Sequence, residues 1–331
     1  MYVGKVFNLK VLWPFAKKNL IRTILASTAV TSLYYFMGWK FLAVPFLPVG
    51  TIGTAVAFYV GFKNNQAYER LWEARKLWGG ITNNSRMLTA TIRSIIQDKD
   101  VQKDILMRHL TYVNILRLQL RKTIPWATSR EDIHQSSVSE AEELLEYDKA
   151  LFKLFERLNK LEIYELIKNR KNIANNALQQ QYTIIGRLKR EKKIDDFEHS
   201  DILRIFNEFY NLQGGCERIK NTPLFRQYSI FSRIFVVLFI FLLPFSLLSS
   251  MDNITHIGPL GVWLTVPFAT LISWVFFSME QIGEFSENPF DNGINDIPLT
   301  TICRNIEIDV LEMMGETDLP EKMEPTNNVL L

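Results

Sequence analysis

Apolar and charged residues are distributed unevenly along the chain. Two stretches near its start, Thr23–Trp39 and Phe41–Phe62, contain no Asp, Glu, Lys or Arg. Two more, Ile234–Met251 and Ile254–Met279, follow a long charged middle region and are separated by Asp252. At a rise of ~1.5 Å per residue, a helix of roughly 20 residues crosses the ~30 Å hydrocarbon core of a bilayer. The pattern therefore predicts two hairpins of membrane-spanning helices, four spans in all.

Three prolines lie in the second hairpin: Pro244, Pro259 and Pro267. Proline disrupts the interior of a helix in water, but membrane helices accept it where neighbouring helices satisfy the freed carbonyls. The prolines therefore do not exclude the spans. A soluble helical protein with buried core helices is the alternative, but it would need four long uncharged stretches to arise without a bilayer.

The middle region, Arg70–Tyr228, has the pattern of long helices. Leu110–Leu120 is rich in apolar residues among basic ones, and Glu142–Leu161 alternates charge with Leu and Phe at helical spacing. Three other segments are predicted to form a loop, a charged turn and a surface helix, respectively Thr123–Ser139, Lys189–His199 and Asn172–Gln181.

Basic residues are concentrated on one side of the predicted spans. They are Lys17, Lys18 and Arg22 before the first span, Lys63, Arg70, Arg75 and Lys76 after the second, and Arg226 and Arg233 before the third. The connection between the third and fourth spans carries Asp252 and no Lys or Arg. Because Lys and Arg are enriched in cytoplasmic segments, we expect a multi-pass protein of the cell membrane with both termini and the middle region in the cytoplasm.

The residues that carry catalysis or bind metals are sparse. The 331 residues have a formal net charge of only +3, which does not indicate nucleic-acid binding. The four histidines, His109, His134, His199 and His256, have no second His or Cys at metal-ligand spacing. Cys216 and Cys303 are both expected on the reducing side of the membrane, where a disulfide does not persist. We therefore predict no enzyme activity, no catalytic or metal site and no cofactor.

Three ordered motifs are distinctive. They are Phe58–Arg70 (FYVGFKNNQAYER) followed by Trp72–Gly79 (WEARKLWG); Cys216–Ile219 (CERI) with Thr222–Pro223; and Glu280–Glu284 (EQIGE) with Glu287–Phe290 (ENPF), Asn295–Leu299 (NDIPL) and Cys303. Together they resemble the bestrophin family, and the resemblance extends from the first span to about Gly315.

The resemblance implies an all-α membrane protein with four transmembrane helices and a cytoplasmic helical region. Five such subunits surround one central ion pathway, which has a narrow neck lined by the second span and a cytoplasmic vestibule ending in an aperture. The chain is thus expected to be a subunit of a homopentameric ion channel in the lipid bilayer, passing small monovalent ions passively. Its expected parts are an N-terminal cytoplasmic segment (1–22), transmembrane helices 1 and 2 including the pore helix (23–80), the cytoplasmic helical region (81–228), transmembrane helices 3 and 4 (229–283) and a C-terminal cytoplasmic segment (284–331).

The family's pore positions fall on particular residues of this chain. The neck positions correspond to Thr54, Phe58 and Phe62, whose spacing of four places them on one helix face. Repeated around a pore, apolar rings of this kind gate by dewetting, and the positive edges of Phe rings suit a partly dehydrated anion. Ordinary helix packing is the alternative. The aperture position corresponds to Leu224, next to Arg226.

Ion selectivity depends on local charge. The family is best known for anion channels, although some bacterial relatives conduct cations. Lys220 and Arg226 flank the predicted aperture and, repeated fivefold, would form a basic ring, which nearby Glu217 would offset. We expect anions such as chloride, with a sodium-type monovalent cation channel of the same fold as the alternative. A membrane scaffold or a transporter is a further alternative, although the two hairpins lack the internal repeat common in transporters.

Calcium is not expected to bind after the fourth span. Animal members of the family bind it through an acidic cluster that follows the Asn-Pro-Phe motif, but Asp291–Asp296 contains few carboxylates here. Calcium takes six to eight oxygen ligands. We instead expect Asn288, Asp291 and Asp296 to act as capping and turn residues.

Overall fold

The computed structural model of the chain describes residues 1–4, 9–122, 140–158, 160–252 and 258–330. In these ranges the protein is helical, apart from two isolated β-bridges that pair Tyr2 and Thr326 with Val329. The helices are α1 (Leu9–Phe36), η1 (Lys40–Leu42), α2 (Phe46–Ile95), α3 (Lys99–Arg121), α4 (Glu140–Arg157), α5 (Leu161–Ile167), α6 (Ile173–Arg190), α7 (Asp196–Asn221), α8 (Arg226–Met251), η2 (Gly258–Leu264), α9 (Thr265–Ser286) and α10 (Leu299–Met314). The all-helical prediction is confirmed.

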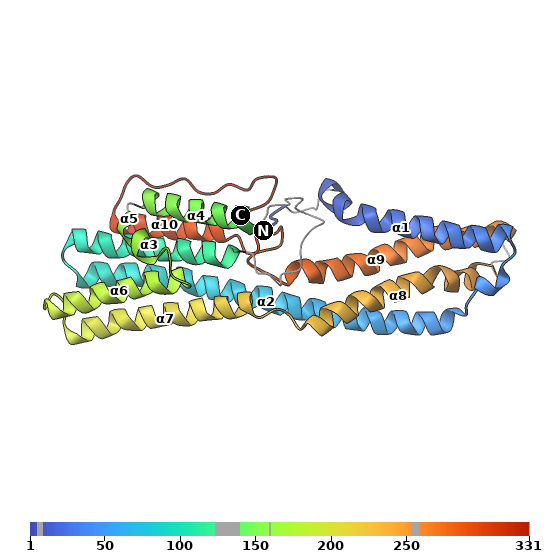
Figure 1. Cartoon of the computed structure of the whole chain (residues 1–331), viewed down its shortest axis with the longest axis horizontal. Coiled ribbons are helices and arrows are strands. Elements are labelled where there is room, and N and C mark those ends of the chain that lie inside the picture. Colours follow the sequence, from blue (N-terminus) through green and yellow to red (C-terminus); the bar gives the residue numbers. More distant parts are fainter. Residues whose placement is uncertain (5–8, 123–139, 159, 253–257, 331) are drawn as a thin grey trace.

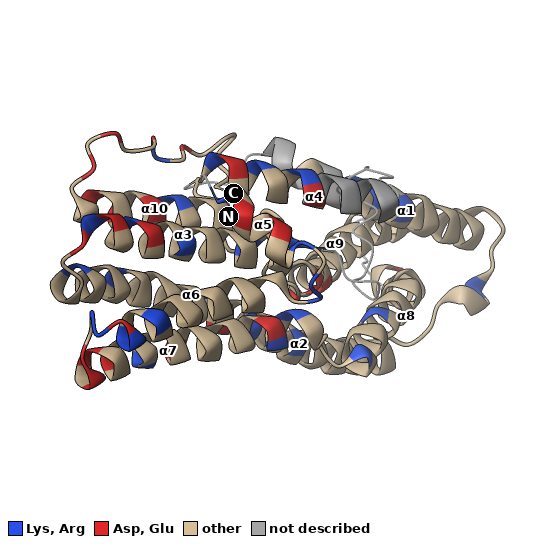
Figure 2. Ribbon diagram, turned by 60° about the vertical axis from the view of Figure 1, so that its left-hand side comes forward, with Lys and Arg blue, Asp and Glu red and all other residues tan. Residues whose placement is uncertain are grey.

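The helices lie along the long axis of an elongated molecule (Figure 1). One end, which we call the membrane half, contains α1, α8, α9 and the first part of α2. The other end, the polar half, contains α3 to α7, α10 and the rest of α2, and both chain termini lie beside it. Charged side chains are concentrated in the polar half, whereas α8 and α9 carry few (Figure 2). The uneven sequence pattern therefore corresponds to a division of the molecule in space.

Helix α2 joins the two halves without a break. It has 50 residues, which at ~1.5 Å per residue makes it about 75 Å long. Its buried residues recur every three or four positions and so form one continuous face: Val49, Gly53, Val56, Val60, Lys63, Ala67, Leu71, Ala74, Trp78, Ile81, Ser85, Leu88, Thr89 and Ile92. The division predicted between residues 80 and 81 falls inside this helix, so the two parts share one rigid element.

Three helical segments of the described chain are long and apolar enough to cross a bilayer: Lys40–Ile95, Arg226–Met251 and Gly258–Ser286. They correspond to the predicted second, third and fourth spans. Helix α1, the predicted first span, is not among them, because Lys17, Lys18, Asn19 and Arg22, together with its Thr, Ser and Tyr residues, lower its mean hydropathy. A total of four spans therefore stays a prediction.

Three hydroxyl-bearing residues of α1 lie on the face that packs into the protein. Thr23, Ser27 and Thr31, spaced four apart, are buried, and α1 packs mainly against α9. The Ser27 hydroxyl donates a hydrogen bond to the carbonyl of Thr23 at 2.6 Å. Small hydroxyl residues that bond to their own helix let two membrane helices approach closely. A hydropathy average cannot distinguish a membrane helix with such a buried polar stripe from a soluble helix.

Close helix contacts hold the membrane half together. A Cβ atom added at Gly53 of α2 would lie 2.5 Å from the ring of Phe239 in α8, so only glycine allows this approach. Pro244 is buried inside α8, which continues through it to Met251. Pro267 lies in the first turn of α9, where a helix tolerates proline. The prediction that these two prolines are compatible with the spans is confirmed.

The polar half has its own apolar core between α2, α3, α6, α7 and α10. Trp78, Tyr112, Phe206 and Phe209 are among its largest fully buried side chains. The segment Asn172–Gln181 is helical as predicted, and the Asn172 side chain caps α6 by accepting a hydrogen bond from the backbone of Asn175. The expectation of a surface helix is only half right, because five α6 residues up to residue 181 are buried: Ile173, Ala174, Ala177, Leu178 and Gln181.

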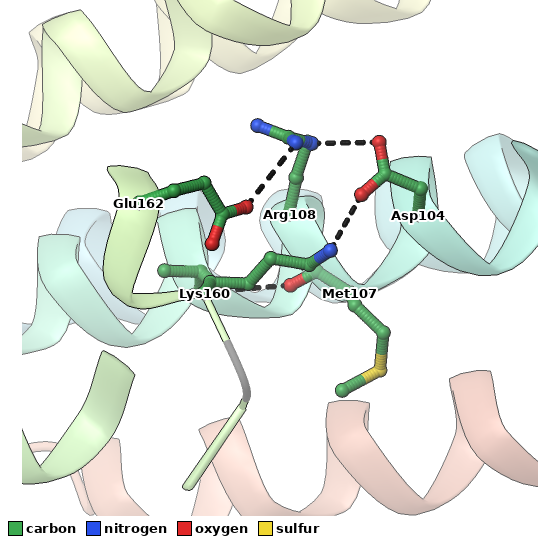
Figure 3. Close-up of polar contacts among 6 residues, drawn as sticks. Asp104, Met107, Arg108, Lys160 and Glu162 are labelled. Carbon is green, nitrogen blue, oxygen red and sulfur yellow. Dashed lines mark hydrogen bonds and ion pairs between the residues drawn. The ribbon is translucent and has the colours of Figure 1, made fainter. Parts of the chain in front are cut away.

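Ion pairs fix the short helix α5 against α3 (Figure 3). The carboxylate of Asp104 contacts Arg108 at 2.8 Å and Lys160 at 2.5 Å, while Arg108 reaches Glu162 at 3.4 Å. Burial by itself would raise the pKa of Asp104, but hydrogen bonds from Arg108 and Lys160 hold that pKa below its usual value. The network positions the first turn of α5.

The predicted charged turn Lys189–His199 contains the end of α6, a five-residue connection at 191–195, and the start of α7. The Asp195 side chain accepts from the Glu198 backbone, and Glu198 accepts from the Asp195 backbone, which together form a capping box. The predicted loop Thr123–Ser139 lies outside the described residues.

The two cysteines are far apart in the sequence and do not pair. Cys216 of α7 and Cys303 of α10 are both free and buried. Burial raises the pKa of each thiol to about 12. Because the thiolate is the reactive form, both side chains are chemically inert at neutral pH.

Candidate functional site

An open apolar groove of about 850 Å³ runs along the exposed face of α2 in the membrane half. Thr54, Phe58 and Phe62 all line it, so the structure places the three predicted neck residues on one face. The other lining residues are Phe46, Gly50, Gly53, Ala57, Gly61 and Asn65 of α2, Phe239 and Leu243 of α8, and Ile272 and Phe276 of α9. The groove wall contains no Asp, Glu, Lys or Arg.

The groove forms because α2 buries only its opposite face against α8 and α9. Phe58 and Phe62 are consequently 67% and 65% exposed. The hydroxyl of Thr54 donates to the carbonyl of Gly50 at 3.1 Å. Its hydrogen atom is therefore used by the helix, and the hydroxyl oxygen presents mainly acceptor character to the groove.

A buried ion pair lies one residue beyond Phe62. The Lys63 ammonium contacts the Glu280 carboxylate of α9 at 2.5 Å, and the exposed fractions of the two side chains are only 1% and 6%. The other oxygen of Glu280 accepts from the Ser232 hydroxyl of α8 at 2.5 Å. Beside this pair, the Asn64 amide donates to the carbonyl of Met279. Three helices are thus fixed together at the inner end of the groove.

Arg70 makes a second junction two turns further along α2. Its guanidinium donates to the carbonyls of Ile219 and Thr222 at 2.8 Å and of Glu287 at 3.1 Å. It therefore satisfies backbone groups at the end of α7 and after α9. The sequence pattern identifies Lys63 and Arg70 only as basic residues that follow the second span. Their partners lie about 150 to 220 positions away, and no local pattern reveals them.

The predicted aperture residues lie in the turn between α7 and α8. Leu224 is buried, with 6% of its surface exposed, whereas the adjacent Phe225 is 76% exposed. Arg226, the first residue of α8, is also exposed. In the isolated subunit the outward apolar side chain of this turn is therefore Phe225, one residue after the predicted position.

The expected basic ring around the aperture is wrong for Lys220. Its ammonium pairs with Asp291 at 2.7 Å, and its side chain is only 8% exposed, so its charge is neutralised inside the subunit. Glu217, expected to offset this ring, accepts hydrogen bonds from Gln119, Asn172 and Gln213. Of the two cations considered, only Arg226 is exposed.

The segment after α9 uses its acidic residues in local structure. Asp291 pairs with Lys220, and Asp296 accepts a hydrogen bond from the backbone of Gly293 at 2.7 Å, as expected of a turn residue. Within the described ranges, no group of three or more His, Cys, Asp or Glu side chains could hold a metal ion.

The fold and the groove together define an all-helical membrane protein with an outward-facing apolar stripe on its longest helix. The chain matches the Bacterial/Fungal Bestrophin protein family over residues 5–312. It belongs to the bestrophin family.

Solved structures and curated relatives agree with this assignment. A bacterial bestrophin homologue from Klebsiella pneumoniae superposes with a TM-score of 0.75 and 26% identity, covering 90% of this chain and 98% of that one. The voltage-dependent anion channel-forming protein YneE of Escherichia coli K12 is 29% identical over 95% of this chain and 91% of its own length. The voltage-dependent anion channel-forming protein mll4386 of Mesorhizobium japonicum is 30% identical over 84% of this chain and 77% of its own length.

Proposed function

We propose that the chain is one subunit of a closed ring, most simply of five copies, around a central pathway for small monovalent anions such as chloride. The observation that carries the proposal is the exposed, uncharged stripe of Thr54, Phe58 and Phe62 on α2. The groove in one subunit is open along its length, so the stripe needs further copies to form a pore. Five copies would stack these residues into three rings.

The proposed setting is the cell membrane, with the polar half in the cytoplasm. The basic residues Arg70, Arg75 and Arg233 lie on the polar-half side of the apolar spans, which agrees with the cytoplasmic enrichment of Lys and Arg. Both chain termini lie beside the polar half (Figure 1), so the same orientation places them in the cytoplasm. The names of the relatives support an anion pathway.

A monovalent cation channel of the same fold is the second candidate, and one observation favours it. The pairing of Lys220 with Asp291 removes half of the basic residues expected at the aperture, while Glu69 is exposed on the neck face of α2. Whether the pathway prefers anions or cations therefore depends on the balance between the remaining basic residue, Arg226, and the acidic residue Glu69.

Recording from purified protein in a planar bilayer tests the proposal. With asymmetric KCl, we expect discrete unitary currents whose reversal potential is displaced from zero toward the equilibrium potential of chloride. A reversal potential displaced toward the equilibrium potential of potassium would instead indicate the cation channel. Protein that assembles in the bilayer but gives no current above that of protein-free membranes would refute a channel of either kind.

A further inference from the structure

The groove face of α2 continues beyond the apolar neck into polar residues. Asn65 lies three positions after Phe62 and lines the groove, and Glu69 follows four positions later. These spacings keep both residues on the face that carries Phe58 and Phe62. Both side chains are exposed. The first charged group met on leaving the neck is therefore a carboxylate.

Asn65 holds this carboxylate toward the neck. Its amide nitrogen donates to Oε1 of Glu69 at 3.0 Å, so the Glu69 side chain points back along the helix by one turn. In the described part of the chain, no Lys or Arg forms an ion pair with Glu69. Glu73, one turn further along, differs because it pairs with Arg218 of α7. Among the described residues, Glu69 thus has no ion-pair partner, whereas Glu73 has one.

We propose that Glu69, oriented by Asn65, is a selectivity-determining residue that weights ion flow toward cations at the inner mouth of the neck. This inference rests on the proposed ring, in which each subunit contributes one carboxylate. Seven residues separate Glu69 from Phe62, a rise of about 10 Å. At physiological salt the screening length is about 8 Å, so screening reduces the field of each carboxylate in the neck to roughly a quarter, and the carboxylates of all the subunits in the ring act together on ions there.

Lys76 is the basic residue that competes with Glu69 on the same face. It is exposed and lies seven positions deeper in the polar half, about 21 Å from Phe62 along the helix. That distance exceeds two screening lengths, so the field of Lys76 at the neck is weak compared with that of Glu69. On this face of α2, the Glu69 carboxylate therefore contributes more to the potential at the inner mouth than Lys76 does.

Charge added to a cysteine at this position provides the test. Glu69→Cys is modified from the cytoplasmic side with a sulfonatoethyl (negative) or a trimethylammonioethyl (positive) methanethiosulfonate, and the chloride-to-potassium permeability ratio is measured before and after. The native thiols of Cys216 and Cys303 are buried and do not react. We expect the unmodified variant to exceed the parent ratio by about threefold or more, the negative reagent to reverse this gain, and the positive reagent to increase it.

Asp196→Cys is the matched control. Asp196 is exposed and is the first residue of α7, a helix of the polar half (Figure 1), so neither reagent should change the permeability ratio there. Asn65→Ala, which releases the intact Glu69 carboxylate, should raise the ratio by a smaller factor than Glu69→Cys.

The outcomes separate this inference from the proposed channel. A parent protein without current refutes the channel itself. A conducting parent whose permeability ratio responds equally to both reagents at position 69, or not at all, keeps the channel and refutes the role of Glu69. Because one folded variant receives both charges, a folding defect cannot produce opposite shifts.

Discussion

The exposure of Phe58 and Phe62 indicates that this face of α2 is covered when subunits assemble. Burying a Phe ring is worth ~1.5–3 kcal/mol, yet both rings keep about two thirds of their surface exposed in the isolated subunit. Lipid could cover them, but the same face continues into Asn65 and Glu69, which do not belong in hydrocarbon. A pore, apolar at the neck and polar below it, accommodates both kinds of residue.

Truncation of the two rings tests their place in the pathway. Phe58→Ala and Phe62→Ala should widen the neck and lower its dewetting barrier, so that unitary conductance or open probability rises by roughly twofold or more. The measurement is single-channel recording. Phe241 of α8, 63% exposed, provides the control, and Phe241→Ala should leave the currents unchanged. Parent-like currents from both neck variants would mean that these rings only pack.

His109 is buried for structural reasons. Its Nε2 lies 2.9 Å from the Ser85 hydroxyl, and its ring packs 4.7 Å from that of Phe209. Burial lowers its pKa to about 3, so the folded protein keeps it neutral where the unfolded chain, with a pKa of ~6.5, is protonated. Its contribution to stability is complete above pH 6.5 and is lost as the pH falls toward 3.

Acidification should therefore destabilise the protein by about 1.4 kcal/mol for each pH unit below 6.5 through this residue alone. Thermal unfolding in detergent at pH 7.5 and pH 5.5 measures the effect. His109→Asn should show a smaller difference between the two pH values than the parent, and His199→Asn, at a less buried site, should behave as the parent does. Equal pH dependence in parent and His109→Asn would contradict the assignment.

At the scale of elements, the contacts that fix α2 lie just inside the neck. Lys63, Glu280 and Ser232 join α2, α9 and α8 through two short contacts in a buried site. Such a pair adds little net stability compared with apolar residues, but removing one partner leaves a buried charge without compensation.

Lys63→Met should therefore destabilise the subunit by roughly 3–5 kcal/mol, whereas the double variant Lys63→Met with Glu280→Leu should recover most of the loss. Denaturant unfolding in detergent gives both values. If the double variant is as unstable as the single one, the pair contributes through more than charge compensation.

The acidic residues of the segment after α9 already have partners within the subunit. Asp291 and Asp296 are engaged with Lys220 and with the Gly293 backbone, so a calcium ion would have to displace these contacts. We expect channel currents to survive calcium chelation. Asp291→Asn should lower thermal stability, because it removes the partner of a poorly exposed lysine, and should leave any calcium response unchanged. Currents that vanish in chelator and return with micromolar calcium would disprove this reading.

At the scale of the whole molecule, the sequence predicted the helical class and the separation into an apolar and a charged half. Both depend on averages over many residues. It did not predict where single charges point: Lys220 looked like a pore residue but pairs with Asp291, 71 positions away. The same limit explains Leu224 and Phe225, neighbours with opposite exposure, and α1, whose Thr and Ser residues are polar but buried.

Assembly is a property of the whole chain. Because the groove in one subunit is open along its length, the conducting form should be a closed ring, most simply a pentamer. Native mass spectrometry of the detergent-solubilised protein should give five times the subunit mass of 38.6 kDa. A conducting species with the mass of a single subunit would rule out the ring.

Because α2 is one unbroken helix, it can tilt as a rigid lever and transmit motion from one half of the molecule to the other. The contacts of Lys63 and Arg70 hold α2 near its middle and so form the pivot of this lever. The predicted neck residues lie on one side of the pivot, and the core of the polar half lies on the other. Thr54 lies nine residues beyond Lys63, an arm of about 14 Å, so a tilt of about 5° would displace it by about 1 Å. In the proposed ring, a shift in the packing of the polar half would in this way alter the bore of the neck without bending any helix.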